Sequence, residues 1–130
     1  GGKRPSGFNK GYFYEPTVFD NIKDDFKIMK EEPFGPLTPI LAFKDFDDVV
    51  KRANNQVAGL AAYVCTGSIE LANKTSESLE TGMVAVNTPF ISNAETPFGG
   101  IKQSGYGREG GSMGIKDYLN IKYTHLGIIN

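Results

Sequence analysis

The 130-residue chain is long enough for a single domain with a buried core. Hydrophobic residues make up 39% of it and charged residues 22%, as in ordinary soluble proteins, and the formal net charge of -1 excludes a general attraction to nucleic acid or to an anionic membrane. No apolar run approaches the roughly 20 residues that span a bilayer, so neither a membrane nor a nucleic acid is expected as a partner.

The amino-terminal third predicts extended, irregular structure. Residues 1–10 open GGKRPSG without methionine, which fits a tag remnant, a disordered terminus or the cut end of a longer protein. Residues 11–19 (GYFYEPTVF) and 37–43 (LTPILAF) are rich in aromatic and β-branched residues and predict strands. Each contains a proline, and in the first strand this suits an edge or a bulge. Between them, two prolines and a glycine in residues 31–36 (EEPFGP) forbid regular structure.

An amphipathic helix follows, and then an apolar strand. Apolar residues recur at i, i+3, i+4 and i+7 from Phe46, and Asp45 before them is placed as the N-cap. The helix is expected to end near residues 54–55. Residues 60–65 (LAAYVC) are wholly apolar and predict a short strand that is buried on both faces.

A second helix and a third strand repeat this order. Ser68 is the expected N-cap, and Gly82 is the expected C-terminal stop. Residues 83–86 (MVAV) predict another buried strand. The side chains expected to point inward from the helix are Ile69, Ala72 and Leu79.

The alternation of strands and helices from residue 37 to residue 86 predicts an α/β fold. Its parallel strands would be joined by right-handed crossovers into one layer. Ligands of such sheets bind beyond the carboxyl ends of the strands, where residues 87–111 begin. After that segment, residues 112–119 predict a short helical stretch, and residues 120–129 predict a last strand with no partner nearby in sequence.

Residues 87–111 (NTPFISNAETPFGGIKQSGYGREGG) form the most informative stretch. So long a segment without periodicity is uncommon in a compact domain unless it has a function. Six glycines lie between residues 99 and 111, and Phe90 and Phe98 stand among polar neighbours. We therefore expect an ordered loop that lines a pocket. Residues 105–110 match G-x-G-x-x-G, but a loop and not a strand precedes them, which favours a structural turn over a dinucleotide fingerprint.

Other reactive residue types point to structure rather than chemistry. Cys65 is the only cysteine, which excludes an internal disulfide and favours a reducing, cytoplasmic location. Its apolar strand is typical of a small buried hydrophobe, not of a nucleophile. His125 is the only histidine, so a histidine-based metal cluster is excluded.

Residues 31–36 admit two interpretations. They form either a turn with solvated acids or a rigid backbone that aims one carboxylate and one aromatic ring into a site. A carboxylate can accept two hydroxyl hydrogen bonds and a ring can pack on a flat heteroaromatic face, which suits a nucleotide-type ligand.

Four motifs together resemble the region near the carboxyl end of NAD(P)-dependent aldehyde dehydrogenases. They stand in the order and spacing of that family and cover essentially the whole chain. The ending is most similar to succinate-semialdehyde dehydrogenases, through residues 91–92, 102–105 and 114–123. The four motifs are G-Y-F-x-x-P-T-V at 11–18, E-E-P-F-G-P at 31–36, N-x-x-x-G-L-A-A-Y-V at 55–64 and P-F-G-G-I-K-Q-S-G-Y-G-R-E-G at 97–110.

The resemblance implies an architecture and roles for particular residues. Residues 1–119 would form part of the α/β catalytic domain, and residues 120–130 would form the terminal oligomerisation strand, with self-association through Asn120–Ile129. Glu32 and Phe34 would contact the nicotinamide ribose and ring of NAD or NADP. On the side of the small-molecule aldehyde, Ser92 would bind the substrate carboxylate and Phe98 would line the substrate tunnel. Phe90 would border the same tunnel.

The resemblance also implies what this chain lacks. The family's nucleophilic cysteine, general-base glutamate and oxyanion-hole asparagine lie upstream of the matched region, so no catalytic residue is assigned and the chain alone is expected to be inactive. An alternative is a non-catalytic module that pairs with a full-length subunit through its last strand. A small-molecule-binding α/β domain unrelated to catalysis would require the four matches to be coincidental.

Overall fold

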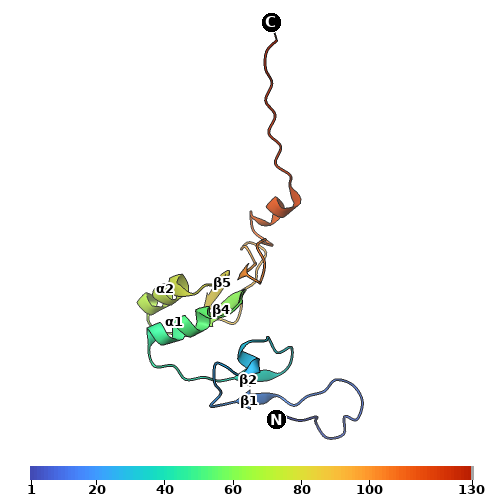
Figure 1. Ribbon diagram of the computed structural model, residues 1–130, viewed down its shortest axis with the longest axis vertical. Helices are drawn as coiled ribbons and strands as arrows, with labels where there is room; N and C mark the ends of the chain where they lie inside the picture. Colours follow the sequence, from blue (N-terminus) through green and yellow to red (C-terminus); the bar gives the residue numbers. More distant parts are fainter. Residues whose placement is uncertain (130) are drawn as a thin grey trace. The chain divides into compact units, whose positions relative to one another are not determined.

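The computed structural model describes residues 1–129, and Asn130, the last residue of the expected terminal strand, lies outside the described residues (Figure 1). The chain divides into two compact units, one formed by Gly1–Val49 and the other beginning at Val50. Each unit is described by itself below.

The first unit is built on one parallel pair of strands. β1 (Thr17–Phe19) pairs with β2 (Leu37–Pro39), with the 3-10 helix η1 (Lys27–Met29) between them in sequence. Both strands were predicted, but each is shorter than expected. β1 begins only after Pro16, since proline has no N–H to donate to a ladder, and β2 ends at Pro39 itself.

The first residues of the chain contact β1. The Gly2 amide donates to the Thr17 hydroxyl oxygen at 2.6 Å, and the Glu15 amide donates to the Lys3 carbonyl at 2.9 Å. Thr17 is buried, with 9% of its surface exposed, and its hydroxyl donates in turn to the Glu15 carbonyl at 2.8 Å. This one hydroxyl therefore links the beginning of the chain to the strand pair.

Helix α1 (Phe46–Asn54) begins with the predicted cap. The Asp45 carboxylate accepts a hydrogen bond from the Asp48 amide at 2.9 Å, and the Asp48 carboxylate accepts one from the Lys44 amide at 3.0 Å. Two backbone donors at the helix start are thereby satisfied by side chains. Both the N-cap and the end near residue 54 are confirmed.

We expect Asp45→Ala to lower the free energy of unfolding by about 1 kcal/mol, because the Asp48 amide loses its acceptor. The shift in the midpoint of urea denaturation measures this loss. Asp45→Asn keeps a side-chain oxygen and should cost only a few tenths of a kcal/mol. If the asparagine variant is as unstable as the alanine variant, the negative charge and not the capping hydrogen bond stabilises the helix.

The second unit contains the predicted parallel crossover. β4 (Ala61–Val64) and β5 (Met83–Val86) pair in parallel, joined by helix α2 (Ile69–Ser78), as Figure 1 shows. The Ser68 hydroxyl accepts from the Leu71 amide at 3.2 Å, so the predicted N-cap is confirmed. The buried hydrophobic residues of the described chain belong to this crossover, namely Ala72, Met83 and Ala85.

The expectation of one continuous parallel layer from residue 37 to residue 86 is wrong. β2 pairs with β1 instead of β4, and the described residues contain three two-stranded sheets. The third sheet was not predicted. It joins β3 (Ala58–Gly59) to β6 (Ile101–Lys102) in antiparallel fashion. Two-residue strands have no periodicity that a sequence could reveal, so this pairing had no local signal.

Several predicted burial assignments are also wrong. Tyr63 in β4 is 58% exposed, Cys65 just after it is exposed, and Ile69 in α2 is 75% exposed. Apolar runs of this kind indicate buried strands only when both faces are covered, and in this structure they are not. Helix α2 also ends at Ser78, four residues before the predicted stop at Gly82.

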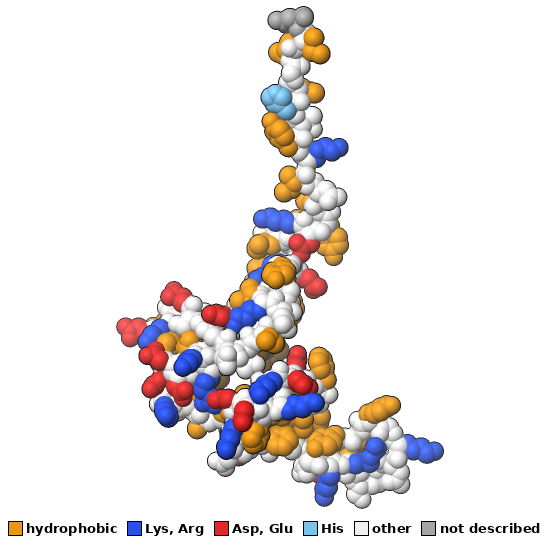
Figure 2. Space-filling view, viewed as in Figure 1, with side chains coloured by type: hydrophobic (Ala, Val, Ile, Leu, Met, Phe, Trp, Pro, Cys, Tyr) orange, Lys and Arg blue, Asp and Glu red, His pale blue; other side chains and the backbone are white. Residues whose placement is uncertain are grey.

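The carboxyl-terminal part is helical only briefly. The 3-10 helix η2 (Gly114–Tyr118) confirms the short helical stretch. Residues 119–129 have neither helix nor strand, and Ile121 and Tyr123 among them are exposed. Figure 2 shows hydrophobic side chains on the surface of this part of the chain. A strand needs a neighbour for its backbone groups, and the described residues supply none here. The predicted pairing with another subunit therefore stays a prediction.

Among residues 1–129, no helix combines the length and the apolar character that a membrane crossing requires.

Candidate functional site

The EEPFGP segment folds into two consecutive tight turns. The Gly35 amide donates to the Pro33 carbonyl at 3.0 Å, and the Leu37 amide donates to the Gly35 carbonyl at 2.8 Å. Hydrogen bonds from i+2 to i define γ-turns, with Phe34 and Pro36 at their centres. The Pro36 carbonyl then accepts from the Thr17 amide at 2.9 Å, which fixes the end of the segment to β1.

Phe34 lies at the centre of the first turn, and Glu32 directly precedes that turn. The Phe34 ring is 96% exposed at the centre of the first turn, and Glu32 is exposed beside it. The neighbouring acid is engaged locally, since the Glu31 carboxylate lies 3.3 Å from the Lys27 ammonium of η1. A fixed backbone with an accessible carboxylate and an accessible ring can bind a ligand that has hydroxyl groups and a flat ring.

The long loop leaves the second unit through an asparagine clamp at the carboxyl ends of β4 and β5. The Asn87 side chain accepts from the Thr66 amide at 2.9 Å and donates to the Thr66 carbonyl at 2.8 Å. Its backbone amide donates to the Val64 carbonyl at 2.8 Å, and its φ of 56° lies in the left-handed region that asparagine tolerates. The predicted starting point of the loop is therefore confirmed.

The front half of the loop is a series of side-chain-capped turns. The Thr88 hydroxyl accepts from the Phe90 amide at 3.1 Å, and the Asn93 side chain accepts from the Glu95 and Thr96 amides, both at 2.9 Å. Between these turns the Phe90 ring is 84% exposed and Ser92 is exposed. The loop is thus ordered, as expected, with its predicted substrate residues accessible.

Phe98 is held by the returning chain. Its amide and carbonyl exchange hydrogen bonds with Glu109 at 2.7 and 2.8 Å, and its side chain is half-buried. The Arg108 guanidinium braces the same region by donating to the carbonyls of Gly100 at 2.6 Å and Gly107 at 2.8 Å. The glycine-rich half therefore forms a structural support behind Phe98.

The G-x-G-x-x-G match at residues 105–110 behaves as a turn. The strand before it is the two-residue antiparallel β6, and the element after it is the 3-10 helix η2. The described residues therefore do not place this match in a strand–turn–helix unit that could bind a pyrophosphate. The interpretation as a structural turn agrees with the structure.

The profile of the aldehyde dehydrogenase family matches residues 1–124. The chain belongs to the aldehyde dehydrogenase family.

Relatives of this aldehyde dehydrogenase chain include enzymes with different names. It is 48% identical over 131 residues to the mitochondrial succinate-semialdehyde dehydrogenase of Oryza sativa subsp. japonica, covering all of this chain and 24% of that protein. It is 52% identical over 114 residues to aldehyde dehydrogenase 1A1 of Mesocricetus auratus, covering 88% of this chain and 23% of that protein. The chain therefore spans about a quarter of the length of the curated relatives it matches.

A solved structure shares the fold. The crystal structure of an E. coli NADP-dependent enzyme superposes with a TM-score of 0.91 at 46% sequence identity, covering 98% of this chain and 26% of that one.

The five predicted site residues of this aldehyde dehydrogenase chain fall into two groups. Glu32 and Phe34 belong to the first unit, whereas Phe90, Ser92 and Phe98 share one loop of the second unit. Four of the five are exposed, and Phe98 is half-buried. No group of three or more potential metal-binding side chains occurs among residues 1–129.

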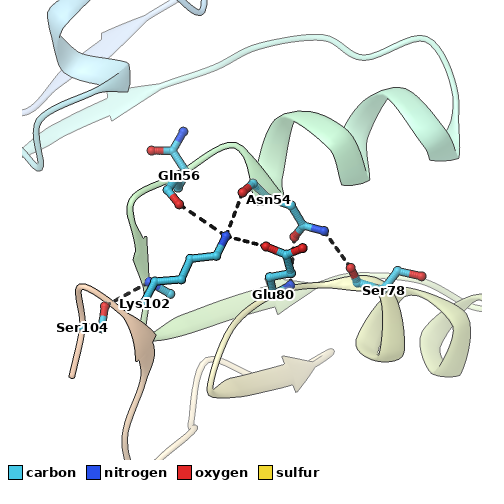
Figure 3. Close-up of polar contacts among 7 residues, drawn as sticks. Asn54, Gln56, Ser78, Glu80, Lys102 and Ser104 are labelled. Carbon is cyan, nitrogen blue, oxygen red and sulfur yellow. Dashed lines mark hydrogen bonds and ion pairs between the residues drawn. The ribbon is translucent and has the colours of Figure 1, made fainter. Parts of the chain in front are cut away.

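Sequence reasoning missed a polar network around Lys102, which links the glycine-rich half of the loop to Asn54, Gln56 and Glu80 (Figure 3). Lys102 contacts residues that precede it by 22 to 48 positions, so no local pattern announces the network. The Asn87 clamp was missed as well, but it had a signal, because an asparagine directly after an apolar strand is suited to a left-handed turn.

Proposed function

We propose that this chain is the carboxyl-terminal part of an NAD(P)-dependent aldehyde dehydrogenase that oxidises succinate semialdehyde to the corresponding dicarboxylic acid. The observation that carries the proposal is the ordered loop beyond β4 and β5, in which Phe90 and Ser92 are exposed and Phe98 is held by hydrogen bonds to Glu109. The carboxyl-terminal placement rests on the order of the four sequence motifs. The upstream sequence tests it, since a nucleophilic-cysteine segment must lie before Gly1; such a segment after Asn130 would contradict it.

The cofactor side of the proposed site is the double γ-turn. The Glu32 carboxylate would accept hydrogen bonds from the nicotinamide ribose hydroxyls, and the Phe34 ring would pack beside the nicotinamide. The exposure of both residues, together with the hydrogen-bonded turn at Phe34, fits such a ligand. NAD or NADP supplies the hydride acceptor when it is bound. The E. coli structural neighbour is described as an NADP-dependent enzyme.

The substrate side is the front half of the loop. The Ser92 hydroxyl would donate a hydrogen bond to the carboxylate at the far end of the substrate. Phe98 and Phe90 would form an apolar wall of the substrate tunnel. A loop that carries one hydroxyl donor and two aromatic rings suits a short aliphatic chain that ends in a carboxylate, which is the chemical form of succinate semialdehyde.

Activity requires more than this chain. The 130 residues supply binding groups but no assigned nucleophile, so we propose that they are inactive alone. The purified full-length polypeptide should reduce NAD+ or NADP+ when succinate semialdehyde is added, as measured by the absorbance of the reduced cofactor. The 130-residue chain should reduce the cofactor no faster than buffer without protein. Aldehyde-dependent reduction by the short chain would contradict the assignment, and so would an inactive full-length polypeptide.

A second candidate follows from the exposed tail. Ile121, Ile128 and Ile129 are almost fully exposed along residues 119–129, which suits strand pairing with a full-length aldehyde dehydrogenase subunit through Asn120–Ile129. On this candidate the chain is a non-catalytic module with a start codon just upstream. Co-purification of the 130-residue chain with a full-length subunit, abolished by removing residues 120–130, would favour it.

The proposed location is the cytoplasm. It rests on the single cysteine, which gives the chain no internal disulfide to protect it in an oxidising compartment. The rice relative is named as a mitochondrial protein, so fractionation of cells that express the full-length polypeptide is the direct test.

A further inference from the structure

Lys102 adopts a backbone conformation that its residue type disfavours. The Ser104 amide donates to the Ile101 carbonyl at 3.1 Å, which places Lys102 at the first central position of a tight turn. Its φ is 55°, in the left-handed region where glycine is the preferred residue. Such conformations persist only where the surroundings impose them, and they cluster at functional sites. A side chain at this position therefore needs a compensating interaction.

The ammonium group of Lys102 makes three such interactions, drawn in Figure 3. It lies 2.6 Å from the Glu80 carboxylate and donates to the Asn54 carbonyl at 2.8 Å and the Gln56 carbonyl at 3.3 Å. Only 25% of the Lys102 side chain is exposed, so these contacts are partly shielded from water. A cation at the last carbonyl of α1 also complements the helix dipole.

Asn54 extends the network to the second helix. Its side-chain amide donates to the Ser78 carbonyl at 2.8 Å, and its side-chain oxygen accepts from the Glu80 amide at 2.8 Å. Lys102 thereby joins the ends of both α1 and α2 to β6. β6 begins only three residues after Phe98, and the intervening backbone lies directly against Gly82 and Gly59. A displacement of Lys102 therefore reaches Phe98 through a short, closely packed segment.

We propose that Lys102 is a positioning residue whose ammonium group holds residues 98–102 in place and so sets the position of Phe98 in the substrate wall. The inference deepens the proposed function and rests on it for the role of Phe98. The residues of the network all belong to the second unit, and Glu32 and Phe34 belong to the first, so its effect is expected on the aldehyde and not on the dinucleotide.

The test uses the full-length polypeptide and two measurements. Lys102→Met removes the ammonium group, and amide hydrogen exchange in residues 98–104 should become about tenfold faster while β4 and β5 are unchanged. The KM for the aldehyde should rise roughly tenfold, with the KM for the dinucleotide changing by less than about twofold. Lys51→Met, at an exposed position on α1, is the matched control and should change neither measurement.

Two further variants at residue 102 test the role of the positive charge and replace the methionine variant if it does not fold. Lys102→Arg retains a cation and should restore most of the exchange protection. Lys102→Gly also relieves the left-handed backbone, so it serves if the methionine variant does not fold. Unchanged exchange at residues 98–104 would overturn the proposal, and so would faster exchange with an unchanged KM for the aldehyde. The exchange measurement needs no activity, so it decides whether Lys102 holds the segment even if the proposed function fails.

Discussion

Gly82→Ala should destabilise the protein by about 3 kcal/mol or more, the largest stability effect of any change considered. A Cβ atom at residue 82 would overlap the carbonyl oxygen of Gly99, and it would lie 2.7 Å from the Cα of Gly100. Both neighbours are backbone atoms, so no side chain can rotate to make room. The backbone of residues 99–100 would have to move away from residue 82, which directly precedes β5. The midpoint of thermal unfolding of the full-length polypeptide measures the effect.

Gly67→Ala is the matched control. Residue 67 is also a glycine between secondary-structure elements, but a Cβ there would meet no atom within 4 Å. Its expected effect is within about 0.5 kcal/mol. Equal stability of the two variants would mean that the close approach of residues 82 and 99 does not contribute to the fold.

Ser92→Ala should weaken the use of a carboxylate-bearing aldehyde far more than that of a neutral one. A hydrogen bond to a charged group contributes roughly 1.5 to 3 kcal/mol, which corresponds to a rise in KM of roughly 10- to 150-fold for succinate semialdehyde. The KM for a neutral aldehyde of similar length should stay close to that of the unaltered enzyme. Steady-state kinetics of the full-length polypeptide with both substrates gives the comparison.

Two outcomes would contradict the role of Ser92. Equal changes in KM for the two aldehydes would mean that the hydroxyl does not bind the substrate carboxylate. No change in either KM would mean that Ser92 does not contact the substrate at all. Ser112→Ala changes another exposed serine, outside the proposed site, and should leave both KM values unaltered.

The sequence predicted the structural elements that depend on residues close together in the chain. Asp45 and Ser68 cap their helices because a short side-chain oxygen precedes an apolar period of 3.6 residues, and the structure contains both hydrogen bonds. The parallel pairing of β4 with β5 followed from the strand–helix–strand order. The accessible loop at their carboxyl ends followed from the same topology.

Features caused by distant residues were not predictable. The antiparallel pairing of β3 with β6 joins segments more than 40 residues apart through two residues each. The ion pair between Lys102 and Glu80 has the same character. Burial failed for a different reason: Tyr63 and Ile69 carry the apolar side chains of a core, but nothing in the described chain covers them. The apolar pattern predicts which face of a helix or strand should be buried. Whether that face is buried depends on the elements that pack against it.

The two asparagines of the loop, Asn87 and Asn93, have a consequence for how this enzyme family could diversify. Each uses its own side chain to fix the backbone next to it, one on the strand ends and the other on the following turn. The five residues 88–92 between them are exposed or half-buried. On the proposed function, substitutions at residues 88–92 would change the groups that the loop offers to an aldehyde, while the side chains of Asn87 and Asn93 still fix the backbone on either side. Selection for a new substrate can act there at little cost to folding.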